Sequence, residues 1–351
     1  MRQGAPALEL DWCGVDEAPL LQELVEAYWS RGHVLARDEA LLRWQYRIEG
    51  DDERLSVLLA RLDSRPVGFL GVIRTRFCWS GEDMHGGWLA TWTVAPESRS
   101  TQAGLALVQR AIDSFDVVGC IGFNETAERI YRALGFEIRS PLPRYVRAVD
   151  PAALERLLGR ADAALTATAG ASAPATTVAV DWSGAAAERW ERTWRERIAG
   201  GFVGSARDSA FLRWRYVEHP VYRYVVRFAE GAAALVVHRV ETVRDRDERV
   251  VRFVEALGDP AAAAGLVALA LAEEPRAALA DFACATEADA EAFVRCGFVA
   301  EEALLERPPD WFLPLARSPR GLALALRAPG ARPPHGQVYA TRADGDQDRP
   351  S

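Results

Sequence analysis

The chain carries one ten-residue stretch twice, as RDEALLRWQY at residues 37–46 and as RDSAFLRWRY at residues 207–216. The two copies are identical at seven of ten positions and lie 170 residues apart. At the same spacing, DWCG at 11–14 matches DWSG at 181–184. Two matches in one register, both containing the rare residue tryptophan, indicate a tandem duplication of one folding unit.

The ends of the two copies can also be located. LGF at 134–136 and CGF at 296–298 lie 162 residues apart, so the second copy has lost about eight residues (170 − 162) before this point. Between the copies, TATAGASAPATT at 166–177 consists of small residues that bury little apolar surface, which predicts a linker. The expected organisation is a domain at 1–150, a helix and flexible linker at 151–177, a domain at 178–330 and a C-terminal tail at 331–351.

Composition narrows the class of protein. A length of 351 residues agrees with two medium-sized domains, and the chain contains no lysine, which excludes mechanisms that need an ε-amine. A formal net charge of −8 disfavours a nucleic-acid partner. Five cysteines without a C-x-x-C pair favour neither a disulfide framework nor a metal site. Together with the absence of an apolar leader, this predicts a cytoplasmic protein with no membrane anchor.

The apolar periodicity of the first copy predicts an α/β (α+β) domain. Helices are expected at 20–29, 39–47, 104–114 and 125–134, and strands at 56–61, 67–76, 87–94 and 117–123. Gly135 suits a left-handed helix cap, and a further strand is expected after it.

Two motifs of the first copy carry a resemblance. VAPESRSTQAGL at 94–105, between an expected strand and an expected helix, resembles the acyl-CoA pyrophosphate loop of the GNAT N-acetyltransferase superfamily, V-x-P-x-x-R-x-x-G-x-G. Downstream, Asn124, Ala127, Tyr131 and residues 135–136 resemble the N-x-x-A-x-x-x-Y-x-x-x-G-F pattern of that superfamily. The resemblance implies two tandem GNAT-like domains, each a mixed, mainly antiparallel sheet flanked by helices.

The resemblance also implies an acyl-CoA co-substrate, with acetyl-CoA the simplest choice. Backbone amides that open a helix form an anion site, and an arginine adds a fork of donors for phosphate. The expected cofactor-binding residues are Val94, Arg99, Gln102, Ala103, Gly104, Leu105 and Asn124. Gln102 departs from the family pattern, which usually has glycine there, and a side chain at this position restricts positive φ. Asn124 can also be the N-cap of the helix that follows.

Tyr131 is implied to be the general acid that protonates the departing CoA thiolate, which a phenol with a pKa of about 10 can do. Spacing alone would make Tyr131 a half-buried aromatic residue of a helix. No carboxylate lies between residues 88 and 94, so the expected general base is His85, with Asp83, Glu82 or a water chain as alternatives.

Aromatic residues are expected to wall the acceptor pocket. Trp44 and Tyr46, preceded by His33, form a W-x-Y pattern that resembles GNAT-like acyltransferases linked with surface-polysaccharide and amino-sugar biosynthesis. Because the pair recurs at positions 214 and 216, it can equally belong to the core. The predicted activity is direct transfer of an acyl group, in a ternary complex, to the amine of a small molecule such as an amino sugar.

The second copy lacks these features. Its counterpart of the loop, at 257–265, contains an aspartate and no arginine, and 286–292 has neither Asn nor Tyr. We therefore expect a non-catalytic partner that shapes the acceptor site. DGDQD at 344–348 is expected to be a solvated acidic tail, since it lacks the remaining ligands of a calcium loop. Two alternative functions remain: a Fem-type aminoacyl-tRNA-dependent transferase and a non-catalytic GNAT-fold binding protein.

Overall fold

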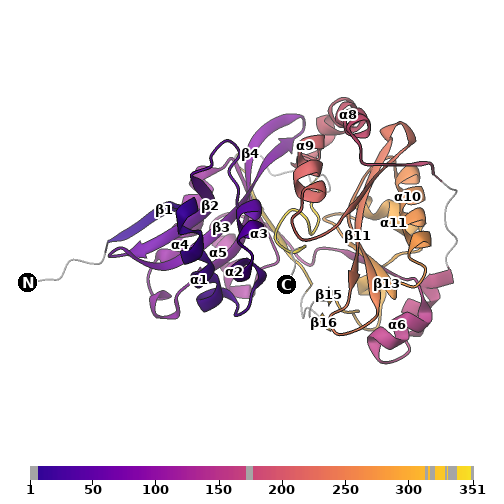
Figure 1. The fold of residues 1–351 in the computed structure, drawn as a ribbon, viewed down its shortest axis with the longest axis horizontal. Coiled ribbons are helices and arrows are strands. Elements are labelled where there is room, and N and C mark those ends of the chain that lie inside the picture. The colour runs from indigo at the N-terminus through magenta and orange to yellow at the C-terminus, as the bar shows by residue number, and fades with distance from the viewer. Residues whose placement is uncertain are drawn as a thin grey trace, which may run out of the picture.

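The computed structural model describes residues 7–170, 177–312, 315–316, 321–328, 330 and 338–348. The chain forms two lobes, each built around one large sheet, and the last described residues lie between them (Figure 1). Both lobes are mixed α/β units, as the sequence predicts.

The first sheet has the strand order β1-β2-β3-β4-β5-β17-β6, with β9 added beside β3. Its strands are β1 (Leu8–Gly14), β2 (Arg54–Leu62), β3 (Arg65–Trp79), β4 (Glu82–Val94), β5 (Val117–Ile121), β6 (Glu137–Arg139), β9 (Val203–Ser205) and β17 (Leu324–Arg327). The pair β4/β5 is parallel and the other pairs are antiparallel. Its helices are α1 (Ala18–Leu24), the π-helix η2 (Val25–Trp29), α2 (Val34–Arg37), α3 (Glu39–Gln45), α4 (Ala103–Ser114) and α5 (Glu125–Ala133).

Helices cover both faces of this sheet, which explains the nearly continuous apolar run of β2. Leu58 packs in one core cluster with Leu107 of α4, whereas its neighbour Leu59 packs in another with Leu42 of α3. The predicted helices and strands are confirmed with small shifts at their ends, while β1 and α2 were not predicted. Gly135 ends α5 with φ +82°, as expected of a left-handed cap.

The second sheet has the order β14-β7-β13-β12-β11-β10-β8. Its strands are β7 (Arg144–Ala148), β8 (Ala179–Asp181), β10 (Val225–Ala229), β11 (Ala234–Thr242), β12 (Arg249–Gly258), β13 (Leu279–Ala283) and β14 (Val299–Ala300). Around it lie α6 (Pro151–Leu158), α7 (Ala163–Thr166), α8 (Gly184–Thr193), α9 (Ser209–Leu212), α10 (Pro260–Glu273), α11 (Glu291–Arg295) and the small hairpin of β15 (Trp311–Phe312) and β16 (Leu315–Ala316). The parallel pair β12/β13 repeats the pair β4/β5 of the first sheet.

The two halves exchange one strand each. β17, from the end of the chain, lies between β5 and β6, and β7, which follows β6, lies between β13 and β14. The sheets therefore divide between residues 139 and 144 rather than at 150, and 324–327 belong to the first lobe rather than the second. Periodicity identifies a strand but does not tell which sheet it joins, so the expected boundaries of 1–150 and 178–330 differ from the sheets.

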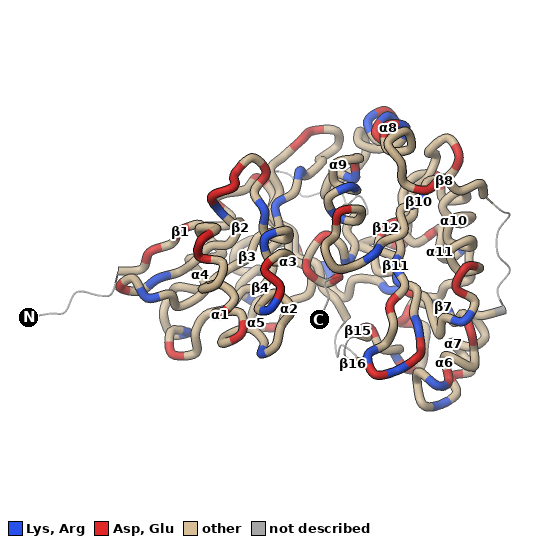
Figure 2. The backbone as a smooth tube through the Cα atoms, viewed as in Figure 1, with Lys and Arg blue, Asp and Glu red and all other residues tan. Residues whose placement is uncertain are grey.

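Two further expectations need correction. The linker begins as structure, because residues 163–170 are helical and Leu165 is fully buried; 171–176 lie outside the described residues. In the tail, 331–337 and 349–351 also lie outside the described residues. Every residue of 338–348 is buried, so this acidic stretch is not a solvated tail. Figure 2 shows acidic residues at the centre of the molecule, where the lobes meet.

The five cysteines are all buried and free. No helix in the described ranges combines the length and the apolar character that a membrane span requires.

Candidate active site

A pocket opens where two parallel strands of the first sheet separate. Pairing between β4 and β5 stops at Leu89 and Cys120. Just beyond, Thr91 forms a bulge with φ +49°, which bends β4 away from its neighbour. The Tyr46 hydroxyl holds this bulge through a 2.6 Å hydrogen bond with Thr91 Oγ1. The resulting pocket of about 1010 Å³ lies between the ends of the two strands and the starts of α4 and α5.

The loop after β4 forms one wall of the pocket. Arg99, Gly104 and Leu105 line it, together with Thr101, which was not predicted. Gln102 is the residue before α4 and has φ −83°, so this position does not need the left-handed freedom of glycine. The first N–H groups of α4 have no acceptor within the helix and the exposed Arg99 lies beside them, an arrangement suited to a pyrophosphate.

Two of the predicted cofactor-binding residues do not line the pocket. Ala103 is fully buried, and neither it nor Gln102 is among the pocket-lining residues. Val94 and Asn124 do line the pocket. The Asn124 side chain also accepts a 2.9 Å hydrogen bond from the Ala127 N–H, so the predicted N-cap is confirmed.

Trp92 supplies a donor without an acceptor. Its indole N–H is buried and has no partner in the described part of the protein, although the ring lines the pocket. A Cβ added at Gly104 would lie 3.8 Å from this nitrogen, which places the donor beside the start of α4. A buried N–H costs free energy unless it is paired, so this one fits a ligand acceptor such as a carbonyl or phosphate oxygen.

Tyr131 lines the pocket, and its phenol is hydrogen-bonded to the thiol of Cys120. Its ring is 2% exposed and packs against Trp92, Phe123 and Phe136. Burial raises the pKa of Tyr131 well above 10, and the hydrogen-bonded thiol of Cys120 acts in the same direction. Burial also raises the pKa of the Cys120 thiol to about 12, so this environment strongly disfavours a thiolate. A thiolate that forms here would therefore need a proton donor, and the Tyr131 phenol is in place.

Asp346 is the residue that sequence reasoning missed. It is the one carboxylate among the described residues that line the pocket, and it is 4% exposed. After burial and Cys120, its charge is a further cause of the raised pKa of Tyr131, so the two side chains are neighbours. Gln347 also lines the pocket and abuts Gly122, where an added Cβ would lie 2.5 Å from the Gln347 amide carbon.

The predicted base and acceptor wall lie elsewhere. His85 is exposed near the far end of β4, and neither it nor Asp83 or Glu82 lines the pocket. His33 instead caps α2 through a hydrogen bond from the Leu35 N–H, and it does not line the pocket.

The repeated aromatic pair belongs to the core and to the contact between the lobes. Tyr46 is buried beneath the bulge, and Trp44 packs against its own repeat counterpart, Trp214, with ring centroids 5.5 Å apart. The aromatic wall of the pocket comes from Tyr28 and Trp29 of η2 and from Trp311 of the second lobe. Tyr46 is thus a core residue, whereas Trp44 lies outside the pocket described above and lines a small cavity that it shares with Asp346.

The second lobe has the same strand arrangement without the pocket loop. α10 begins directly after β12, and Asp259 caps it by accepting from the Ala262 N–H, which puts a carboxylate where an anion would bind. The backbone N–H of Ala256, near the end of β12, donates to the hydroxyl of Tyr339. Tyr339 therefore fills the place in the second lobe that corresponds to part of the first lobe's pocket.

Comparisons with known proteins agree with this geometry. Residues 20–136 match the model of the acetyltransferase (GNAT) family. The fold resembles a GCN5-related N-acetyltransferase from Anabaena variabilis (TM-score 0.60, 12% identity, 92% of this chain and 72% of that one) and another from Kribbella flavida (0.58, 15%, 92% and 71%). It also resembles Saccharomyces cerevisiae N-myristoyltransferase with bound myristoyl-CoA (0.54, 9%, 92% and 84%). A search of the curated proteins finds no match. Residues 20–136 thus match the GNAT acetyltransferase family, and the fold of the chain is that of two GNAT-like domains.

Proposed function

We propose that the protein is an acyl-CoA-dependent N-acyltransferase, with acetyl as the acyl group and the amine of a small molecule such as an amino sugar as the acceptor. One observation carries the proposal. A single pocket joins an anion-binding loop with Arg99, a buried phenol on Tyr131 and one buried carboxylate on Asp346. These groups can bind the phosphates of the donor, give a proton to the leaving thiolate and take a proton from the attacking amine.

The reaction balances with these groups alone. The amine nitrogen attacks the thioester carbonyl carbon, a C–N bond forms, and the C–S bond breaks. Asp346 accepts the proton that leaves the nitrogen, and Tyr131 gives its proton to the thiolate of CoA, so the products are an amide and a neutral thiol. The proton on Asp346 then returns to the phenolate of Tyr131, directly or through water, which restores the starting state.

Binding of the donor is tested by calorimetric titration with acetyl-CoA. The wild type should bind, and Arg99→Ala should bind about tenfold more weakly, because a hydrogen bond to a charged group contributes about 1.5 kcal/mol or more. Arg110→Ala is the matched control, since Arg110 is an exposed arginine of α4 that does not line the pocket. No binding by the wild type would refute the proposal.

Transfer is tested by release of free CoA thiol with a panel of amines that includes glucosamine, nucleotide-linked amino sugars and amino acids. Asp346→Asn keeps the shape of the side chain but removes the base, and it should lower turnover by about 100-fold or more with the best acceptor. Binding of acetyl-CoA without transfer to any acceptor would favour a non-catalytic binding protein instead.

A further inference from the structure

The carboxylate in the pocket does not belong to the lobe that forms the pocket. Asp346 lies on the C-terminal segment, defined here as residues 338–348, which runs between the lobes. Its start is fixed to the first sheet's added strand, because the Tyr339 N–H donates to the Val203 carbonyl at 2.7 Å. Further along, Thr341 forms an isolated bridge with Cys284 of the second lobe.

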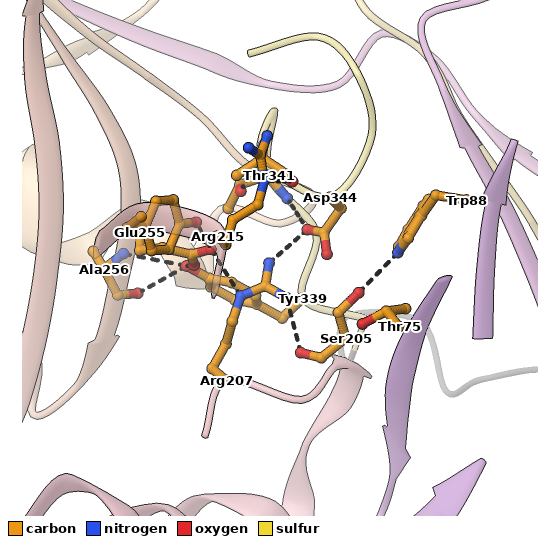
Figure 3. A network of polar contacts seen from close by, with 12 residues as sticks. Thr75, Trp88, Ser205, Arg207, Arg215, Glu255, Ala256, Tyr339, Thr341 and Asp344 are labelled. Atoms are coloured by element: carbon orange, nitrogen blue, oxygen red, sulfur yellow. Dashed lines mark hydrogen bonds and ion pairs between the residues drawn. The ribbon is translucent and has the colours of Figure 1, made fainter. Parts of the chain in front are cut away.

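Two arginines of the second copy hold this segment on either side of Asp346. Arg207 lies between β9 and α9 and its side chain pairs with Glu255 of β12, and Arg239 lies on β11. Arg207 Nη2 lies 2.6 Å from Asp344 Oδ2, and Arg239 Nη2 lies 2.8 Å from Asp348 Oδ1. Figure 3 shows the first of these contacts within a wider network. All four side chains are at most 2% exposed. The carboxylates two residues before and two residues after Asp346 are thus both held by arginines whose side chains also pair with strands of the second sheet, at Glu255 of β12 and Glu241 of β11.

Further hydrogen bonds fix the backbone and the second contact. Arg215 Nε donates to the Ala343 carbonyl at 2.9 Å, and the Tyr224 hydroxyl donates to Asp348 Oδ2 at 2.6 Å. The Thr341 N–H donates to Asp344 Oδ2 at 2.8 Å, so the turn that precedes Asp346 is closed on itself. Asp346, whose Oδ1 accepts a 2.8 Å hydrogen bond from Gln347 Nε2, is the acidic side chain of this stretch that lines the pocket.

Buried ion pairs are a costly way to hold a chain segment. Removing both charges from water offsets most of their attraction, so such pairs often contribute less stability than apolar residues of similar size. The geometry of such pairs is narrowly defined, however, because a planar arginine fork binds a carboxylate in few orientations. The pairs at Asp344 and Asp348 are therefore better explained by placement of the residue between them than by stability.

We propose that the second lobe serves as the positioning domain of the active site: Arg207 and Arg239 hold Asp344 and Asp348 so that Asp346 meets the substrate bound by the first lobe. The inference rests on the proposed function, because it assumes that Asp346 is the base. The second lobe thereby holds the carboxylate in place, in addition to supplying Trp311 to the wall of the pocket. Arg207 and Arg239 are positioning residues, since they act through the segment.

The test is the double variant Asp344→Asn/Asp348→Asn. It weakens both contacts without leaving a buried charge alone, because Arg207 keeps Glu255 at 2.7 Å and Arg239 keeps Glu241 at 2.9 Å. A control is Glu301→Gln, which neutralises another buried carboxylate of the second lobe, one that pairs with Arg144 at 2.7 Å.

Hydrogen exchange of the peptide that contains residues 338–348 reports the position of the segment directly and needs no acceptor. Exchange should be about tenfold faster or more in the double variant and unchanged in Glu301→Gln. With the best acceptor, kcat should fall about 10- to 100-fold, since a small misplacement of a reacting group costs that much. The dissociation constant for acetyl-CoA should stay within twofold, because the first lobe binds it.

Three outcomes would count against the inference or its premise. Unchanged exchange in the double variant, or an unchanged kcat while Asp346→Asn has lost transfer, refutes positioning by the second lobe and leaves the proposed function intact. A loss of acetyl-CoA binding equal to the loss of kcat also refutes it, because the disturbance would then be general. An active Asp346→Asn refutes the assignment of the base, which belongs to the proposed function.

Discussion

Replacement of Tyr131 by phenylalanine should separate catalysis from binding and from stability. The ring is enclosed by Trp92, Phe123 and Phe136, and Phe fills the same space, so the change removes the hydroxyl alone. The lost hydrogen bond with Cys120 should lower the free energy of unfolding by about 1 kcal/mol. A decrease in kcat that corresponds to much more than about 1 kcal/mol must come from the loss of the phenol proton as an acid.

The expected decrease in kcat can be estimated from how strongly the pocket disfavours a thiolate, which the Cys120 thiol beside Tyr131 indicates. Burial raises the pKa of Cys120 from 9.0 to about 12, a measure of how strongly this pocket disfavours a thiolate. The same direction holds for a CoA thiolate in this pocket, and general acid catalysis contributes about 100- to 10,000-fold, so a thiolate that leaves without a proton should be disfavoured by about 1000-fold. We therefore expect kcat of Tyr131→Phe to fall by about that factor, while the dissociation constant for acetyl-CoA changes little.

The assay is release of free CoA thiol, with calorimetry for binding and thermal unfolding for stability. Tyr145→Phe is the control, because it removes another buried phenol hydroxyl, in the second lobe. Since the pKa of Tyr131 is raised well above 10 by its burial, its proton is retained at high pH, and wild-type turnover should not decline between pH 7 and pH 9 for want of this acid. A Tyr131→Phe enzyme within tenfold of the wild type would refute the reasoning.

Three further predictions concern the pocket, the C-terminal segment and the second lobe. Trp92→Phe removes the unpaired indole N–H and should weaken acetyl-CoA binding about fivefold or more by calorimetry, and unchanged affinity would show that this donor does not meet the ligand. Gly122→Ala places a Cβ 2.5 Å from Gln347 at φ +73° and should reduce kcat and thermal stability together. Gly159→Ala, with φ +71° and open space around it, should reduce stability alone. Equal effects of the two variants on kcat would contradict a role for the contact between Gly122 and Gln347. His238→Phe should flatten the pH dependence of stability, because burial lowers the pKa of His238 to about 4. The free energy of unfolding of the wild type should fall by about 2 kcal/mol between pH 7 and pH 5. An equal fall in the variant would show that His238 is not the cause.

The sign of the last effect follows from proton uptake. An unfolded histidine binds its proton near pH 6.5, and the folded His238 does so only near pH 4. Between these values the unfolded chain holds more protons, so acidification favours unfolding. Chemical denaturation at pH 7, 6 and 5 measures the slope for both proteins.

Sequence patterns predicted the parts of the fold that depend on local interactions. The loop of 94–105, the helix that begins after Asn124 and the turn at Gly135 were all predicted, because caps, turns and apolar periodicity act within a few residues. The exchange of β7 and β17 could not be predicted. Neither RYVRA at 144–148 nor LALR at 324–327 contains a local signal for one sheet or the other, and the choice between sheets depends on the whole chain.

The site was predicted where its residues adjoin the family motifs and missed where they come from elsewhere. Arg99 and Tyr131 line the pocket as expected. His85 was chosen because histidine suits a base and lies near the same strand, but a strand of 13 residues is about 40 Å long, and His85 lies near its other end. One signal for the carboxylate that lines the pocket was present in the sequence, namely three aspartates at alternate positions in 344–348.

That signal was misread for a physical reason. A run of carboxylates is normally solvated, because burial of a charge is unfavourable without a partner. The partners here are Arg207 and Arg239, which precede Asp344 and Asp348 by 137 and 109 residues and give no local sign of the contact. Since the chain contains no lysine, every buried cation that can hold a carboxylate is a planar arginine fork, the geometry that fixes an acid most rigidly. The absence of lysine that makes Arg99 the cation of the pocket loop thus also gives the second copy, which lacks an anion loop of its own, two arginine forks that hold the C-terminal segment beside the first copy's pocket.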